Sequence, residues 1–94
     1  MNDREYLGNF EMMVLLSLLR LGEGAYGVPI TTEIEKQSGR AVAVGSVYAA
    51  LERLERKGLV TSRWGEPTAE RGGRAKKHFN VTASGLKELR HAQK

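Results

Sequence analysis

The spacing of apolar residues along the chain predicts helices in its first half. Phe10–Leu21 reads FEMMVLLSLLRL and is apolar on nearly every side, which is typical of a helix that is buried on more than one face. The glycine-rich stretch Gly22–Gly27 is predicted to be a turn. A second helix, with Pro29 in its first turn, then runs to about Ser38. The short stretch Ala41–Val44 is expected to be extended and to lead into a third helix.

The third helix is predicted over Ser46–Lys57 and is amphipathic, and Gly58 ends it. Its apolar side is predicted to consist of Val44, Val47, Leu51 and Leu54. Its exposed side begins with small residues and continues with charged ones, namely Gly45, Ser46, Ala49, Glu52, Arg53 and Arg56. Small side chains allow a helix to approach a DNA groove closely, and Ser46 and Arg53 can donate hydrogen bonds to phosphates or base edges. For Ala49, simple helix propensity is an equally open explanation.

Two short alternating patterns, Leu59–Trp64 and Lys76–Val81, predict a β-hairpin after the third helix. One side of the second strand is largely apolar and is expected to cover the helices. Trp64 closes the first strand and is expected to pack in the core or in an interface. A helix followed at once by such a hairpin predicts a mainly α fold with a small β-hairpin wing, the winged helix-turn-helix.

The loop Gly65–Arg74 between the two strands carries glycine and arginine at its tip. A loop of this length is usually functional or disordered, and its charges suggest contact with phosphates or with the minor groove. A solvated loop without a function is the alternative. The residues of the hairpin predicted to contact DNA are Arg71, Gly72, Arg74, Lys76 and Lys77.

The first helix has more apolar surface than so small a domain can cover, so its second buried side is expected to face another subunit. The alternative is that it is a central core helix. The interface residues predicted on it are Phe10, Met12, Leu15 and Leu19. Thr82 is predicted to cap a short last helix, Ala83–Gln93, which has only a partial apolar stripe.

Charge is divided unequally along the chain, whose net charge is +4. Residues 1–38 hold three Lys/Arg and six acidic residues, a balance of −3, whereas residues 39–94 hold twelve Lys/Arg and five Glu, a balance of +7. The basic half is the one with the third helix and the hairpin, which fits a surface that faces phosphates. A solvated basic face explains the charge alone equally well.

Composition excludes several other kinds of site. The 94 residues suit a single domain, 1–94, and contain no cysteine, so disulfides and thiolate sites are excluded. His78 and His91 have no partner cluster, so no metal and no cofactor are expected, and no catalytic grouping indicates an enzyme. The longest apolar run is far shorter than the roughly 20 residues of a membrane span, and the polar N-terminus is unlike a signal peptide. A cytoplasmic protein with no membrane partner is expected.

Several short segments occur in an order and spacing that resemble the PadR family of bacterial transcriptional regulators over nearly the whole chain. They are Leu18–Glu23, Ala25–Gly27, Val44–Glu55, Gly58–Val60, Trp64, Arg74–Phe79 and Thr82–Gly85. The resemblance implies a winged-helix homodimer that binds an inverted-repeat operator in double-stranded DNA and usually represses transcription.

The resemblance also implies that the third helix recognises DNA through Ser46, Tyr48 and Arg53, and that Gly72, Arg74 and Lys76 belong to the wing. Family members dimerise through a C-terminal helix that wraps around the partner's N-terminal helix, which here implies the helix of about residues 83–93, with Leu86 and Leu89. Two positions depart from the family, Ala49 in place of a common proline and His78 in place of a common aromatic residue.

Three questions stay open at this stage. Tyr48 can contact a phosphate through its hydroxyl or can simply pack at the edge of the core. Trp64 could stack on a small aromatic effector if it lies beside a dimer interface. The alternative function is a winged helix that binds an acidic protein partner and not specific DNA, although the exposed side of the third helix lacks the aromatic residues typical of protein interfaces.

Overall fold

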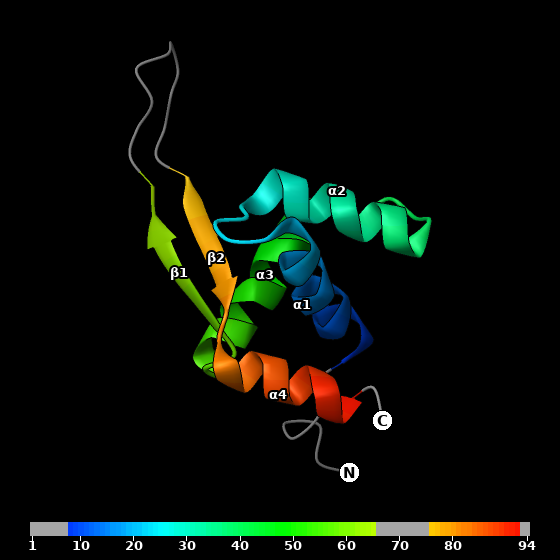
Figure 1. Ribbon diagram of the computed structural model, residues 1–94. Coiled ribbons are helices and arrows are strands. Elements are labelled where there is room, and N and C mark those ends of the chain that lie inside the picture. The colour runs from blue at the N-terminus through cyan, green and yellow to red at the C-terminus, as the bar shows by residue number, and fades with distance from the viewer. Residues whose placement is uncertain (1–7, 66–75, 93–94) are drawn as a thin grey trace.

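The computed structural model describes residues 8–65 and 76–92 and has the predicted winged helix-turn-helix architecture. Its elements are α1 (Asn9–Leu21), α2 (Gly27–Ser38), α3 (Val44–Arg56), β1 (Val60–Trp64), β2 (Lys77–Val81) and α4 (Ala83–Ala92). Each lies within two residues of its predicted bounds, and the largest difference is that α3 begins at Val44 instead of Ser46. Figure 1 shows α1 at the centre, and it contacts α2, α3, α4 and β2.

Glycines and one hydroxyl define several of these helix ends. α1 and α2 are followed by Gly22 and Gly39, whose φ angles of 84° and 71° are disfavoured for residues with a side chain. Pro29 lies in the first turn of α2, where its missing N–H costs no intrahelical hydrogen bond. Thr82 caps α4 as predicted, since its Oγ1 accepts a hydrogen bond from the backbone N–H of Gly85 at 3.0 Å.

The two strands form an antiparallel pair in which Val60 faces Val81 and Ser62 faces Phe79. β2 is also tied to the turn between α1 and α2, because the Phe79 N–H donates to the carbonyl of Ala25 at 2.8 Å. The hairpin is therefore fixed to the helices on one side, and Figure 1 shows β1 and β2 paired along one edge of the helices.

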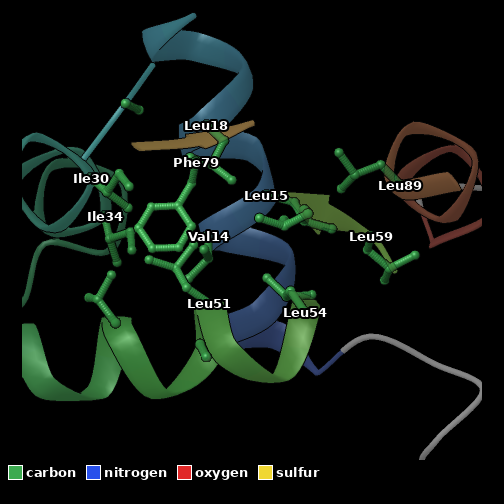
Figure 2. Close-up of a cluster of buried hydrophobic side chains, with 14 residues drawn as sticks. Val14, Leu15, Leu18, Ile30, Ile34, Leu51, Leu54, Leu59, Phe79 and Leu89 are labelled. Atoms are coloured by element: carbon green, nitrogen blue, oxygen red, sulfur yellow. The ribbon is translucent and has the colours of Figure 1, made fainter. Parts of the chain in front are cut away.

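A single hydrophobic core joins all of these elements, as Figure 2 shows. The ring of Phe79 reaches from β2 into the helices, where Val14, Ile30 and Ile34 lie close to it. The fully buried or nearly buried apolar residues are Val14, Leu15, Leu18, Ala25, Ile30, Ile34, Val47, Ala50, Leu51, Leu54, Leu59, Val60, Phe79 and Leu89. The predicted apolar side of β2 is confirmed at Phe79.

Two residues predicted for a subunit interface belong to this core instead. Leu15 has no exposed surface in the single subunit and Leu89 is almost fully buried, so neither has surface to offer a partner. Much of the apolar surface of α1 is therefore explained by the alternative that α1 is a central core helix. Leu19 and Leu86 remain exposed, and Phe10 and Met12 are partly buried. None of the described helices is long and apolar enough to cross a membrane.

Candidate nucleic-acid interface

α3 presents one buried and one exposed side, with one correction to the predicted wheel. Val47, Leu51 and Leu54 are buried as predicted, but Val44 is 45% exposed and Ala50 is fully buried. With 3.6 residues per turn, Val44 and Ala50 lie at similar angles, about 55° and 65°, from the centre of the side formed by Val47, Leu51 and Leu54, so the wheel alone does not distinguish them. Val44 is the first residue of the helix, where fewer neighbouring residues can cover it.

The start of α3 is held in place by its neighbours. The backbone N–H groups of Ser46 and Val47 donate to the carbonyl of Ala43, and the N–H of Val42 donates to the Glu35 carboxylate at 2.9 Å. The side chains of Ser46 and Ala49 are exposed on this anchored turn. Both residues therefore have the accessibility that contact with DNA requires.

Tyr48 packs at the edge of the core, which is one of the two roles that the sequence left open. Its ring packs at a centroid distance of 6.2 Å from that of Phe79 and lies against Gly27, the first residue of α2. A side chain at position 27 would collide with the Tyr48 hydroxyl and ring, so this approach depends on glycine. The tyrosine is nevertheless exposed over a good part of its surface. It therefore borders the core while its surface stays accessible to a phosphate.

A groove of about 380 Å³ separates α3 from the wing. Its lining residues are Tyr26, Tyr48, Glu52, Trp64, Lys76, Lys77 and Phe79. The Lys76 ammonium lies 4.9 Å from the centre of the Tyr26 ring, and that of Lys77 lies 5.8 Å from the centre of the Trp64 ring. The aromatic faces thus hold two cations in the groove, which is a suitable arrangement for an anion such as a phosphate.

Trp64 is not a core residue, which contradicts one of the two sequence-based expectations, whereas packing in an interface stays a prediction. It is 67% exposed in the subunit. The register places Trp64 opposite Lys77 at the end of the hairpin, beyond the reach of the helical core. Its position in the wing also separates it from α1 and α4, the helices expected to form the dimer.

Arg53 has a partner that the sequence reasoning missed. Its Nε donates to Glu11 Oε2 at 3.0 Å, and the ammonium of Lys57 donates to Glu11 Oε1 at 2.9 Å. The Glu11 side chain is only 9% exposed, whereas those of Arg53 and Lys57 are 45% and 32% exposed. This cluster joins the first turn of α1 to the last turns of α3, so Arg53 has a structural role whether or not it also meets DNA.

Glu11 is ionised in this cluster although it is largely buried. Burial by itself raises the pKa of a carboxyl, but the hydrogen bonds from Lys57 and Arg53, the charge of Lys57 and a hydrogen bond from the Gly8 backbone outweigh it and lower the pKa of Glu11. Gly8 is the N-cap of α1 and Glu11 is its N3 residue, the spacing at which a glutamate accepts from the cap N–H. The sequence signal that could have identified Glu11 as the centre of this cluster is a single acidic residue in an otherwise apolar helix, three residues after a glycine.

His78 and Asn80 join the wing to the turn between α1 and α2. The His78 Nδ1 donates to the carbonyl of Gly24, and the Gly24 N–H donates to Asn80 Oδ1 at 3.0 Å. Tyr26 contacts the edge of the His78 ring. The departure from an aromatic residue at position 78 thus adds a hydrogen bond that orients the wing.

Three of the predicted DNA-contacting residues, Arg71, Gly72 and Arg74, lie outside the described residues. Among residues 8–65 and 76–92, no group of three or more His, Cys, Asp or Glu side chains could hold a metal ion.

Comparison with known proteins identifies the family of this chain. Residues 15–91 match the model of the Transcriptional regulator PadR-like family. The chain belongs to this family. Members of the PadR-like family are transcriptional regulators, as the sequence resemblance implied. No curated protein matches the chain.

Solved structures of PadR-like proteins have the same fold. A PadR-like transcription factor from Bacteroides fragilis is 28% identical, with a TM-score of 0.76 over 96% of this chain and 80% of that one. A PadR-like transcriptional regulator from Bacillus cereus is 25% identical, with a TM-score of 0.68 over 89% and 77% of the two chains. PadR of Bacillus subtilis, solved in complex with operator DNA, is 26% identical, with a TM-score of 0.73 over 88% of this chain and 45% of that one.

Proposed function

We propose that this PadR-like protein binds an inverted-repeat operator as a homodimer and represses transcription in the bacterial cytoplasm. The observation that carries the proposal is the groove between α3 and the wing, where Tyr48, Lys76 and Lys77 line one surface beside the exposed first turn of α3. The likeness to Bacillus subtilis PadR, which was solved with operator DNA, supports the same conclusion.

In the proposed complex, α3 enters the major groove with Ser46 and Ala49 toward the bases. The hydroxyl of Tyr48 and the ammonium groups of Lys76 and Lys77 contact the phosphates beside that groove. The carboxylate of Glu52 also lines the groove and repels phosphate. The contact with the DNA backbone is therefore assigned to the side of the groove that carries Lys76 and Lys77. The wing tip, with Arg71, Gly72 and Arg74, is proposed to reach the neighbouring backbone or minor groove.

Arg53 is proposed mainly as a residue that positions α3. Its Nε is bonded to Glu11, and releasing it to reach a base would leave a nearly buried carboxylate with one cation fewer. Removing Arg53 is therefore expected to weaken DNA binding through the placement of α3. Such a loss would be accompanied by lower stability, which the loss of a direct base contact would not cause.

The proposed dimer uses the apolar surface that α1 and α4 leave exposed. These helices contact each other, and Leu19 and Leu86 on them are among the exposed large apolar residues of the described chain. Phe10 and Met12 add partly buried apolar surface on α1. A two-fold dimer that covers these residues would present its two α3 helices to half-sites about 34 Å apart, one turn of DNA.

No effector is included in the proposal. The sequence left open that Trp64 could stack on a small aromatic effector if it lay beside a dimer interface. Trp64 instead lies in the wing groove that is proposed for DNA, and neither proposed dimer helix carries it.

The function is tested by a mobility-shift assay with the DNA upstream of the protein's own gene, with scrambled DNA of the same length as the control. We expect a discrete complex with two chains per site whose affinity falls by a factor of about 10³ or more between 50 and 200 mM salt. Leu19→Glu should give a monomer in sedimentation and lose this complex, whereas Thr32→Glu, on the exposed part of α2, should keep both properties. Equal affinity for scrambled DNA would contradict operator recognition.

Trp64 favours one alternative function. Tryptophan is a common anchor in protein interfaces, and Trp64 is exposed beside the cation of Lys77, so the wing could dock an acidic protein partner. Complete absence of DNA binding at low salt would favour this alternative. If Trp64→Ala and Lys77→Ala each lose DNA binding, this result would favour the DNA-binding role of the same groove.

A further inference from the structure

The first two turns of α3 expose none of the side chains that most often read bases, and the exposed Arg53 and Arg56 lie in its last turn. Over its first eight residues the exposed positions are Val44, Gly45, Ser46, Tyr48 and Ala49, and none of these carries a charge or an amide. The commonest base-specific contacts are bidentate hydrogen bonds from Arg, Lys, Asn or Gln. In these first turns, apolar contacts are therefore available in addition to the hydrogen bonds that Ser46 can donate.

Val44 is the residue best placed for such a contact. It is the first residue of α3 and is 45% exposed, although the two valines nearest to it, Val42 and Val47, are directed to the core. The N-terminal residues of a recognition helix are those that contact base edges. Its exposure is not a result of fraying, because hydrogen bonds to Ala43 and from Val42 to Glu35 anchor this turn.

The major groove presents one apolar group that a valine can contact, the C5-methyl group of thymine. Gly45 follows Val44, and no atom lies within 4 Å of the position a Cβ would take there, so the helix backbone can come close to the base edges beside Val44. We infer that Val44 determines operator specificity by packing against a thymine methyl group. This inference rests on the proposed function and assigns the chemistry by which the operator is read.

The inference is tested by removing only the methyl group from the DNA. An operator is first selected from a random pool of duplexes, and each of its thymines is then replaced by deoxyuridine, which keeps the base pair and the phosphates. We expect one thymine in each half-site whose replacement weakens binding about fourfold, the factor for burying one methyl-sized group, and about fifteenfold when both half-sites are changed.

Two variants assign this effect to Val44. In Val44→Ala the same deoxyuridine replacement should cost less than about twofold, because the methyl group has already lost its partner. Val28→Ala removes another exposed valine from the N-terminal turn of α2 and should keep the fourfold cost. Circular dichroism of both variants checks that they are folded, and Val44→Ser, which removes both methyl groups of the valine, serves as a second variant without the apolar partner.

The outcomes separate this inference from the proposed function. If the unmodified operator is bound specifically but no deoxyuridine replacement matters, or if the cost persists in both Val44 variants, the inference is overturned and the proposed function stands. If selection yields no specific sequence, the proposed function fails and the inference fails with it.

Discussion

Glu11→Ala should destabilise the protein by about 2 kcal/mol, because it removes the anion shared by Arg53 and Lys57. Hydrogen bonds to charged groups contribute about 1.5–3 kcal/mol each when their partners are desolvated. The estimate lies well below the sum of two such bonds, since the two cations are 45% and 32% exposed and can regain water after the truncation. For a domain of this size, such a loss lowers Tm by roughly 8–16 °C.

The assay is thermal and urea unfolding followed by circular dichroism, with Glu33→Ala as the matched control. Glu33 is also paired with two cations, Arg20 at 3.5 Å and Lys36 at 3.9 Å, but both of these side chains are mostly exposed. Its removal should therefore cost about 0.5 kcal/mol or less. A double-mutant cycle of Glu11→Ala with Lys57→Ala should give a coupling energy of about 1 kcal/mol.

The same cluster predicts how stability depends on pH. The folded protein holds the pKa of Glu11 below its ordinary value of 4.5, so the unfolded chain binds a proton more readily than the folded one. The stabilisation by Glu11 is then complete above pH 4.5 and is lost as pH falls through the lower folded-state pKa. The difference in Tm between the wild type and Glu11→Gln should stay constant near neutral pH and shrink in acid.

Two results would refute this reasoning. Equal losses of stability in Glu11→Ala and Glu33→Ala would mean that the shorter distances and the less exposed cations of the Glu11 cluster do not strengthen its ion pairs. A Tm difference between wild type and Glu11→Gln that stays constant down to pH 3 would mean that the pKa of Glu11 is not coupled to folding.

Three further predictions concern packing and charge. Gly85→Ala should destabilise the protein by about 1–2 kcal/mol despite the better helix propensity of alanine, because its Cβ would collide with the carbonyl of Leu59. Gly45→Ala, which has open space around it, should instead stabilise the protein by about 0.5–1 kcal/mol. Unfolding in urea compares the two variants, and a gain of stability in both would contradict the packing of α4. Phe79→Ala should cost about 3–5 kcal/mol and leave a largely unfolded chain by circular dichroism. Lys77→Ala should weaken binding to operator and to scrambled DNA alike and reduce the salt slope by about 1 unit per subunit; a loss confined to the operator would argue against a phosphate contact.

The sequence by itself determined the order and the bounds of the elements. Apolar periodicity placed α1, α2 and α3, and the glycines after α1 and α2 placed their ends, because these signals act between residues a few positions apart. The alternation in β2 likewise identified Phe79 as a residue that faces the helices. The order and spacing of its short segments were sufficient to identify the family.

Only the tertiary structure decided which surfaces stay exposed and which charges are already paired. Leu15 belongs to the core because α1 is surrounded by other elements, and Trp64 is exposed because it lies at the far end of the hairpin. The contact between Glu11 and Arg53 joins residues 42 positions apart, and no local pattern encodes such a pair. Whether an arginine on a predicted DNA-facing helix is available to DNA therefore depends on packing between helices, which the spacing of residues along one helix does not specify.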